Sequence, residues 1–291
     1  MPAATVNGMM LDYTEEGSGE VVVFVHGGSA DQRVWRNQVN AFGTTHRAIA
    51  VSCRGAWPND RPREGEEISL DHHVDDLAVF IRSLDAGPVH LVGHSSPGGF
   101  GRLLIAHRYP DLLRSAVLCE PAAFAVLGLT FPPGPSQVLG LLRRDPRTAI
   151  AMMKFGAQVM RPAMKAMERG DDEVAIRTFA RGNGASDQEL EELLPMMVHD
   201  FPAMKAQVAA GFPDLTADDV RSIRVPTLLV TGTRSPRVLH AIAGRLEEWL
   251  QDVQRLDIEN AAHGMFYTHS DVFNHRVLEF ITAHDRGKRA A

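Results

Sequence analysis

The sequence is poor in the features that mark exported, membrane-spanning or disulfide-bonded proteins. Its 291 residues include only two cysteines, Cys53 and Cys119, too few for a disulfide framework or a cysteine-rich metal centre. No apolar run approaches the roughly 20 residues that cross a bilayer; the nearest, residues 21–25, has the length of a strand. The first residues lack the basic start and apolar stretch of a signal peptide. We therefore expect a cytoplasmic protein with reduced, buried cysteines and no membrane contact.

Neither positive nor negative charge is concentrated in one part of the sequence. Lys and Arg number 30 against 36 Asp and Glu, which gives a formal net charge of -6. The basic residues form no long stripe, so we expect no nucleic-acid partner. At this length the chain can form one large α/β domain, or a domain that carries a sizeable insertion. Whether the chain forms a homodimer stays open.

Short apolar runs alternate with longer helical patterns through most of the chain. Near-continuous apolar runs are typical of parallel strands buried on both faces. They fall at 21–25, 47–51, 88–93, 114–119, 226–231 and 253–258, and helical patterns fall at 33–42, 69–85, 97–109, 236–251 and 270–284. This alternation predicts an α/β fold with a mostly parallel central sheet flanked by helices on both faces. Residues 5–13 are expected to add one antiparallel strand.

The alternation stops between about 121 and 222, where no convincing strand is found. This segment holds eight of the 12 methionines, among them Met153 and Met160. We interpret residues 122–222 as a helical cap inserted into a core of residues 1–121 and 223–291. Because methionine is flexible and polarizable, a Met-rich lid can fit irregular apolar ligands. We predict that part of this methionine set lines a pocket.

Reactive side chains follow the ends of several predicted strands. Ligands of open parallel sheets bind outside the carboxyl ends of the strands. Ser95 follows one strand, Glu120 follows the next, and His263 lies in a loop of small residues beyond the last. A serine hydroxyl becomes a good nucleophile when a base removes its proton, and a carboxylate orients imidazole for that task. Serine, carboxylate and histidine in this order fit a nucleophile, an orienting acid and a general base.

These motifs resemble those of the α/β-hydrolase fold superfamily. The matching pieces are HGGSADQRVW (26–35), LVGHS (91–95), VLCEPA (117–122), PTLLVTGTRSP (226–236) and NAAHGMF (260–266). In addition, WPN (57–59), SPR (235–237) and AHGM (262–265) are similar to a bacterial subgroup of capped serine hydrolases with mixed substrates. The resemblance implies an α/β-hydrolase fold with an inserted helical cap. The sequence also contains no metal-ligand spacing such as H-E-x-x-H, so we expect no metal and no cofactor.

Two adjacent serines compete for the role of nucleophile, because the usual G-x-S-x-G turn is irregular here. Ser95 fits the spacing from the strand, but Pro97 stands where a glycine is expected. Ser96 fits the spacing to Gly98 at the helix. The oxyanion hole uses the N–H of the residue after the nucleophile, and proline has none. We therefore predict Ser95 as the nucleophile and Ser96 as an oxyanion donor, with one extra residue in the turn near Gly98 and Gly99.

The acid of the triad is assigned by the resemblance. Most such hydrolases carry it after the strand at 226–231, where this chain has Ser235, and a hydroxyl cannot stabilise an imidazolium as a carboxylate does. Some members carry it after the strand that follows the nucleophile helix, which is Glu120 here. Asp257 and Glu259 are weaker alternatives. A structural, ion-paired carboxylate is the other interpretation of Glu120.

The loop after residues 21–25 is expected to supply the second oxyanion donor. Gly28 is the first choice and Ser29 the second, since adjacent glycines let the backbone approach a ligand closely. The residues that we expect to contact the substrate are Ser29, Trp35, Trp57, Met153 and Met160.

Together these residues predict a serine hydrolase that cleaves a small apolar carboxylic ester or lactone through an acyl-enzyme. Two alternatives remain. One is a hydrolase of carbon–carbon bonds with the same fold and triad. The other is a ligand-binding homologue that has lost catalysis.

Overall fold

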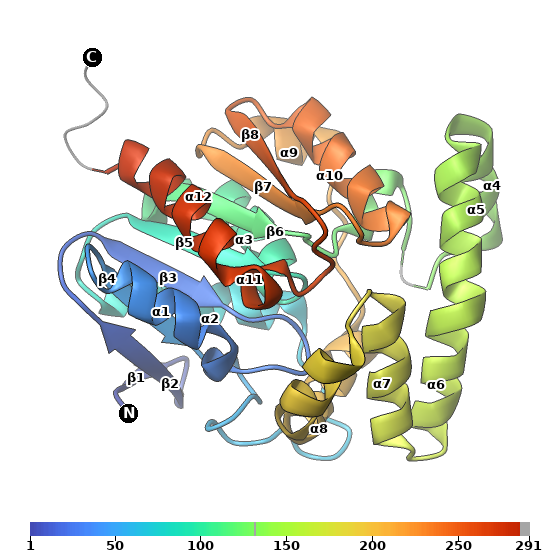
Figure 1. Cartoon of the computed structure of the whole chain (residues 1–291), viewed down its shortest axis with the longest axis horizontal. Coiled ribbons are helices and arrows are strands. Elements are labelled where there is room, and N and C mark those ends of the chain that lie inside the picture. Colours follow the sequence, from blue (N-terminus) through green and yellow to red (C-terminus); the bar gives the residue numbers. More distant parts are fainter. Residues whose placement is uncertain (131, 286–291) are drawn as a thin grey trace.

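An eight-stranded sheet forms the centre of the molecule (Figure 1). The structure is a computed structural model that describes residues 1–130 and 132–285. The strands lie in the order β1-β2-β4-β3-β5-β6-β7-β8, and β3 to β8 are parallel. Their bounds are β1 Ala3–Val6, β2 Met9–Glu16, β3 Val21–Val25, β4 Arg47–Val51, β5 Val89–His94, β6 Leu113–Cys119, β7 Thr227–Gly232 and β8 Val253–Ile258. All six predicted parallel strands are confirmed within one residue at each end.

Helices cover both faces of the sheet. One face packs against α1 (Arg36–Phe42), α11 (Met265–Thr268) and α12 (Ser270–Ala283). The other packs against α2 (Leu70–Ser83), α3 (Gly98–Arg108) and α10 (Arg237–Trp249). The middle residues of β3 are fully buried, as the apolar sequence of a parallel strand predicts. Two separate apolar cores result, one on each side of the sheet.

The N-terminal region forms two antiparallel strands where the sequence analysis predicted one. β1 and β2 pair with Val6 opposite Met9. The two residues between them, Asn7 and Gly8, have φ of 47° and 81°. Positive φ at both central positions is the requirement of a tight two-residue hairpin turn, and Asn-Gly meets it well. The turn splits the predicted strand.

The described residues between β6 and β7 contain helices and no strand. The helices are α4 (Pro135–Arg144), α5 (Pro146–Phe155), a π-helical turn (Gly156–Met160), α6 (Arg161–Glu168), α7 (Asp172–Gly182), α8 (Asp187–Ala210) and α9 (Ala217–Ser222). Figure 1 shows α4 to α8 grouped beside the sheet, whereas α9 contacts α3 and α10. We propose that α4 to α8 act as the cap. Within residues 1–130 and 132–285, no helix combines the length and the apolar character needed to cross a membrane.

Candidate active site

Ser95 lies in a sharp turn between β5 and α3. Its φ is 52°, and its N–H donates to the Cys119 carbonyl on β6 at 2.9 Å. The Ser95 carbonyl accepts a hydrogen bond from Phe100 N–H at 2.8 Å. This bond joins residues five apart, one more than in an α-helical turn, so the extra residue of the motif is accommodated here. Pro97 precedes the first residue of α3, so the helix begins one residue later than the predicted 97.

The two glycines after Pro97 are required by close approach of the backbone. A Cβ at Gly98 would lie 2.5 Å from the Val25 carbonyl oxygen of β3. A Cβ at Gly99 would lie 3.0 Å from Cα of Pro121, beyond the end of β6. Side chains at these positions would therefore push the Ser95 turn away from the neighbouring strands.

Glu120 and His263 form a short hydrogen bond at the end of the sheet. His263 Nδ1 lies 2.6 Å from Glu120 Oε2, and Gly232 N–H donates to Oε1 of the same carboxylate at 2.8 Å. Glu120 is only 1% exposed, and both of its oxygens are hydrogen-bonded, as a buried carboxylate requires. With the proton of His263 held at Nδ1, its Nε2 keeps a lone pair that can accept a proton.

The alternative acids lie elsewhere. Asp257 accepts a hydrogen bond from Arg255 at 3.1 Å, and Glu259 lies 3.5 Å from the Thr233 hydroxyl. Of the carboxylates considered from the sequence, Glu120 is the one that forms a hydrogen bond with His263 in the described structure.

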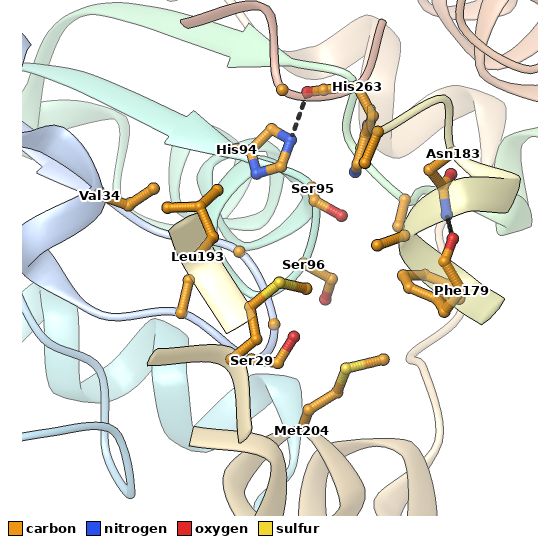
Figure 2. A pocket seen from close by; sticks show the side chains of 18 of the residues that line it. Ser29, Val34, His94, Ser95, Ser96, Phe179, Asn183, Leu193, Met204 and His263 are labelled. Atoms are coloured by element: carbon orange, nitrogen blue, oxygen red, sulfur yellow. Dashed lines mark hydrogen bonds between the residues drawn. The ribbon is translucent and has the colours of Figure 1, made fainter. Parts of the chain in front are cut away.

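The backbone of His263 is held from two sides. His94 Nε2 donates to the His263 carbonyl at 2.9 Å (Figure 2), and His263 N–H donates to the Asn183 carbonyl at 3.4 Å. The rings of His94 and His263 lie 4.3 Å apart. Burial, and after it the charge that His263 can carry, lowers the pKa of His94 well below its usual value. His94 therefore stays neutral beside the base. The sequence analysis missed this role, because only the fold brings residues 94 and 263 together.

Ser95 and His263 face a cavity of about 210 Å³ between the core and the cap (Figure 2). Its walls are largely apolar, and four methionines of the predicted set contribute: Met160, Met196, Met197 and Met204. Ser29, Gly28 and Ser96 form part of the floor. The prediction that part of the methionine set lines a pocket is confirmed.

Three residues expected to contact substrate lie outside this cavity. Trp35 is fully buried in the core, with its ring centroid 4.2 Å from that of Phe266. Trp57 stacks under the Arg33 guanidinium at 4.0 Å. Met153 is 45% exposed. Met153 and Met160 would share a face on a regular α-helix, but the π-helical turn between them rotates the chain and separates them.

The two predicted oxyanion donors lie together. Gly27 and Pro97 form an antiparallel bridge, and a Cβ at Gly28 would lie 3.3 Å from the Ser96 carbonyl oxygen. The loop is braced by His26, whose Nδ1 lies 2.7 Å from the Gly27 carbonyl oxygen. Gly28 and Ser96 are therefore close neighbours, and both line the cavity.

A pair of buried carboxylates joins the loop that contains Gly28 to cap helix α8. Asp200 of α8 lies next to Asp31, and both side chains are at most 1% exposed. Burial, and then the contact with Asp31, raises the pKa of Asp200 to about 6. Burial also opposes ionisation of Asp31, but hydrogen bonds from Arg33 outweigh it and lower the pKa of Asp31. Asp31 therefore ionises at lower pH than Asp200, whose carboxyl keeps its proton up to about pH 6.

Asp200→Asn is expected to stabilise the protein by about 1–3 kcal/mol above pH 7, because the amide replaces the protonated carboxyl. Because the pKa of Asp200 is raised from 3.8 to about 6, the protonated carboxyl contributes its full stabilisation below pH 3.8. This contribution is lost as the pH rises through about 6. The advantage of the variant should thus be absent at pH 4 and grow towards pH 7, which urea unfolding at several pH values measures. Asp60→Asn, at an exposed position, is the control. An advantage independent of pH contradicts the raised pKa of Asp200.

No group of three or more histidine, cysteine or carboxylate side chains that could hold a metal ion occurs in the part of the chain that the structure describes.

The order of the strands, with the Ser95 turn after the central strand β5, defines the α/β-hydrolase class of fold. The pattern of the alpha/beta hydrolase family matches residues 22–276, and the chain belongs to this family.

Relatives of known name differ widely in activity. A non-heme chloroperoxidase of Streptomyces lividans is 29% identical over 287 residues, which cover 95% of this chain and 98% of the relative. A cis-3-alkyl-4-alkyloxetan-2-one decarboxylase of Shewanella oneidensis is 35% identical over 120 residues, but the match spans only 40% of this chain and 37% of that protein. The structure of an enol-lactonase from Burkholderia xenovorans superposes with a TM-score of 0.71 at 19% identity, covering 97% of this chain and 100% of that one. At that identity the likeness concerns the fold.

Proposed function

We propose that this protein is a serine hydrolase that cleaves uncharged carboxylic esters or lactones with an apolar body. The observation that carries the proposal is the 2.6 Å bond between Glu120 and His263, because His263 lines the same apolar cavity as Ser95. A carboxylate-oriented imidazole beside a serine in a strained turn is the arrangement that activates a hydroxyl nucleophile.

Each residue has a defined part in this reaction. Ser95 Oγ attacks the ester carbonyl carbon while His263 Nε2 takes the hydroxyl proton. The backbone N–H groups of Ser96 and Gly28 stabilise the negative charge that develops on the carbonyl oxygen. His263 then gives the proton to the leaving alkoxide, which departs as an alcohol. Water, deprotonated by His263, attacks the acyl-enzyme, and the carboxylic acid leaves with Ser95 restored.

The charges around the cavity indicate which esters it accepts. No lysine or arginine occurs among the described residues that line it, and the one carboxylate there is Glu189. An anionic substrate would lose its hydration without finding a cationic partner, which is costly. A neutral acyl chain, by contrast, binds favourably, because contact with the apolar side chains removes it from water.

We expect the p-nitrophenyl ester of pentanoic acid to be hydrolysed with a kcat/KM at least about 100-fold above that of the p-nitrophenyl monoester of glutaric acid, a few kcal/mol of differential binding. The two acyl chains match in carbon number and differ in a terminal carboxylate. Release of p-nitrophenolate, corrected for the hydroxide-catalysed rate of each ester, measures the ratio. Equal rates would show that the cavity accepts a charge, against the proposal.

A further inference from the structure

One polar contact in the cavity is not explained by the triad. Gln207 Nε2 donates to Ser96 Oγ at 2.6 Å. Gln207 belongs to cap helix α8 and Ser96 to the turn that carries the nucleophile. Both residues are largely buried, at 4% and 8% exposure, and both line the cavity. A cap side chain thus reaches the residue next to Ser95.

This pair keeps hydrogen-bonding capacity for a ligand. A serine hydroxyl can donate one hydrogen bond and accept two, and a glutamine amide can donate two and accept two. In the part of the chain that the structure describes, each of these two side chains makes one hydrogen bond, the one that joins them. The Ser96 O–H and the Gln207 Oε1 are therefore available to a bound molecule.

The surroundings select the chemistry of that molecule. Met204, Val208 and Phe212 are close to Gln207 in the sequence and also line the cavity. Their side chains offer no strong hydrogen bond. With no lysine or arginine among the described lining residues, a carboxylate would stay unpaired. A neutral oxygen, in contrast, can accept from Ser96 O–H or donate to Gln207 without burying a charge.

The position of the pair indicates which part of the substrate it meets. The leaving alcohol takes its proton from His263 and so lies beside that ring. In Figure 2, Ser95 lies between His263 and Ser96. The Ser96 side chain is therefore on the side of the acyl chain, close to the scissile carbonyl.

We propose that Ser96 and Gln207 form a subsite for an uncharged oxygen substituent, a hydroxyl, ether or keto group, carried two or three bonds from the scissile carbonyl on the acyl chain. This inference rests on the proposed esterase or lactonase activity and adds the substrate class. Gln207 then acts as a specificity-determining residue contributed by the cap.

The test compares p-nitrophenyl 3-methoxypropanoate with p-nitrophenyl pentanoate, whose acyl chains have the same number of backbone atoms. After correction for hydroxide-catalysed rates, the wild-type protein should favour the ether by about 10-fold in kcat/KM, the worth of one good hydrogen bond. In Ser96→Ala, which keeps the backbone N–H and removes the hydroxyl that donates to the ether oxygen, this ratio should fall to about 1. In Gln207→Met, which removes the hydrogen bond that orients this hydroxyl, the ratio should fall towards 1. Gln188→Met, an exposed position on the same helix, should keep the wild-type ratio.

The outcomes separate the two levels of the proposal. A wild-type ratio near 1, or a ratio that Ser96→Ala leaves unchanged, overturns the subsite while the esterase activity stands. No turnover of the pentanoate ester by folded wild-type protein contradicts the proposed function, and the subsite falls with it.

Discussion

Ser95→Ala is expected to lower kcat for a chromogenic ester by about 10⁴–10⁶-fold and to abolish labelling by a fluorophosphonate probe. The probe phosphonylates an activated serine oxygen and loses fluoride, so the label reports the nucleophile itself. Ser95 has a positive φ in the turn between β5 and α3 and faces the same cavity as the His263 ring. Alanine removes the attacking atom and leaves the backbone hydrogen bonds of the turn in place.

Ser96→Ala is the matched control for that experiment. The oxyanion contribution assigned to Ser96 comes from its backbone N–H, which alanine also has, so the probe should still label this variant. Labelling lost in Ser96→Ala and kept in Ser95→Ala would transfer the role of nucleophile to Ser96. If the wild-type protein takes up no label at all, the ligand-binding alternative is favoured.

Glu120→Gln is expected to lower kcat by about 10³–10⁴-fold while the fold stays intact. Glutamine can still accept the hydrogen bond from Gly232 N–H through its Oε1. Its Nε2, however, would donate to His263 Nδ1, which moves the imidazole proton to Nε2. The base then carries a proton on the nitrogen that should remove one from Ser95. Circular dichroism and urea unfolding establish that the loss is chemical.

Asp257→Asn tests the competing position of the acid. Asp257 pairs with Arg255 at the surface, so this change should leave kcat within about 2-fold of wild type, as expected of an exposed ion pair. Near-normal turnover in Glu120→Gln together with strong loss in Asp257→Asn would move the acid to the last strand.

The strands and core helices could be predicted because each carries its own local signal. β3 and β4 begin and end at the predicted residues, since a buried parallel strand is apolar along almost its whole length. The half-exposed edge strand β8 also keeps its predicted bounds. The prediction of Ser95 as the nucleophile also rests on local chemistry, because Pro97 has no N–H to offer an oxyanion if Ser96 attacks. Asn7-Gly8 carried a hairpin signal as well, which the sequence analysis did not use.

The contents of the cavity could not be predicted in the same way. Apolar character predicts that a residue is buried but does not distinguish the packed core from the wall of a cavity. Only the structure shows that Trp35 belongs to the core and Met160 to the cavity. Gln207 carried no signal at all, because a glutamine on a cap helix is ordinary until the fold brings it against Ser96.

By itself, then, the sequence determined the α/β architecture, the helical segment between β6 and β7, and the three kinds of side chain that could perform nucleophilic catalysis. Only the tertiary structure decided that Glu120 is the carboxylate in contact with His263, that His94 and the cap hold the backbone of the base, and that Asp31 meets Asp200 between core and cap. The physical reason is sequence separation. Periodicity and turn chemistry act over a few neighbouring residues, whereas these contacts join residues 80 or more positions apart and exist only after strands and helices have packed.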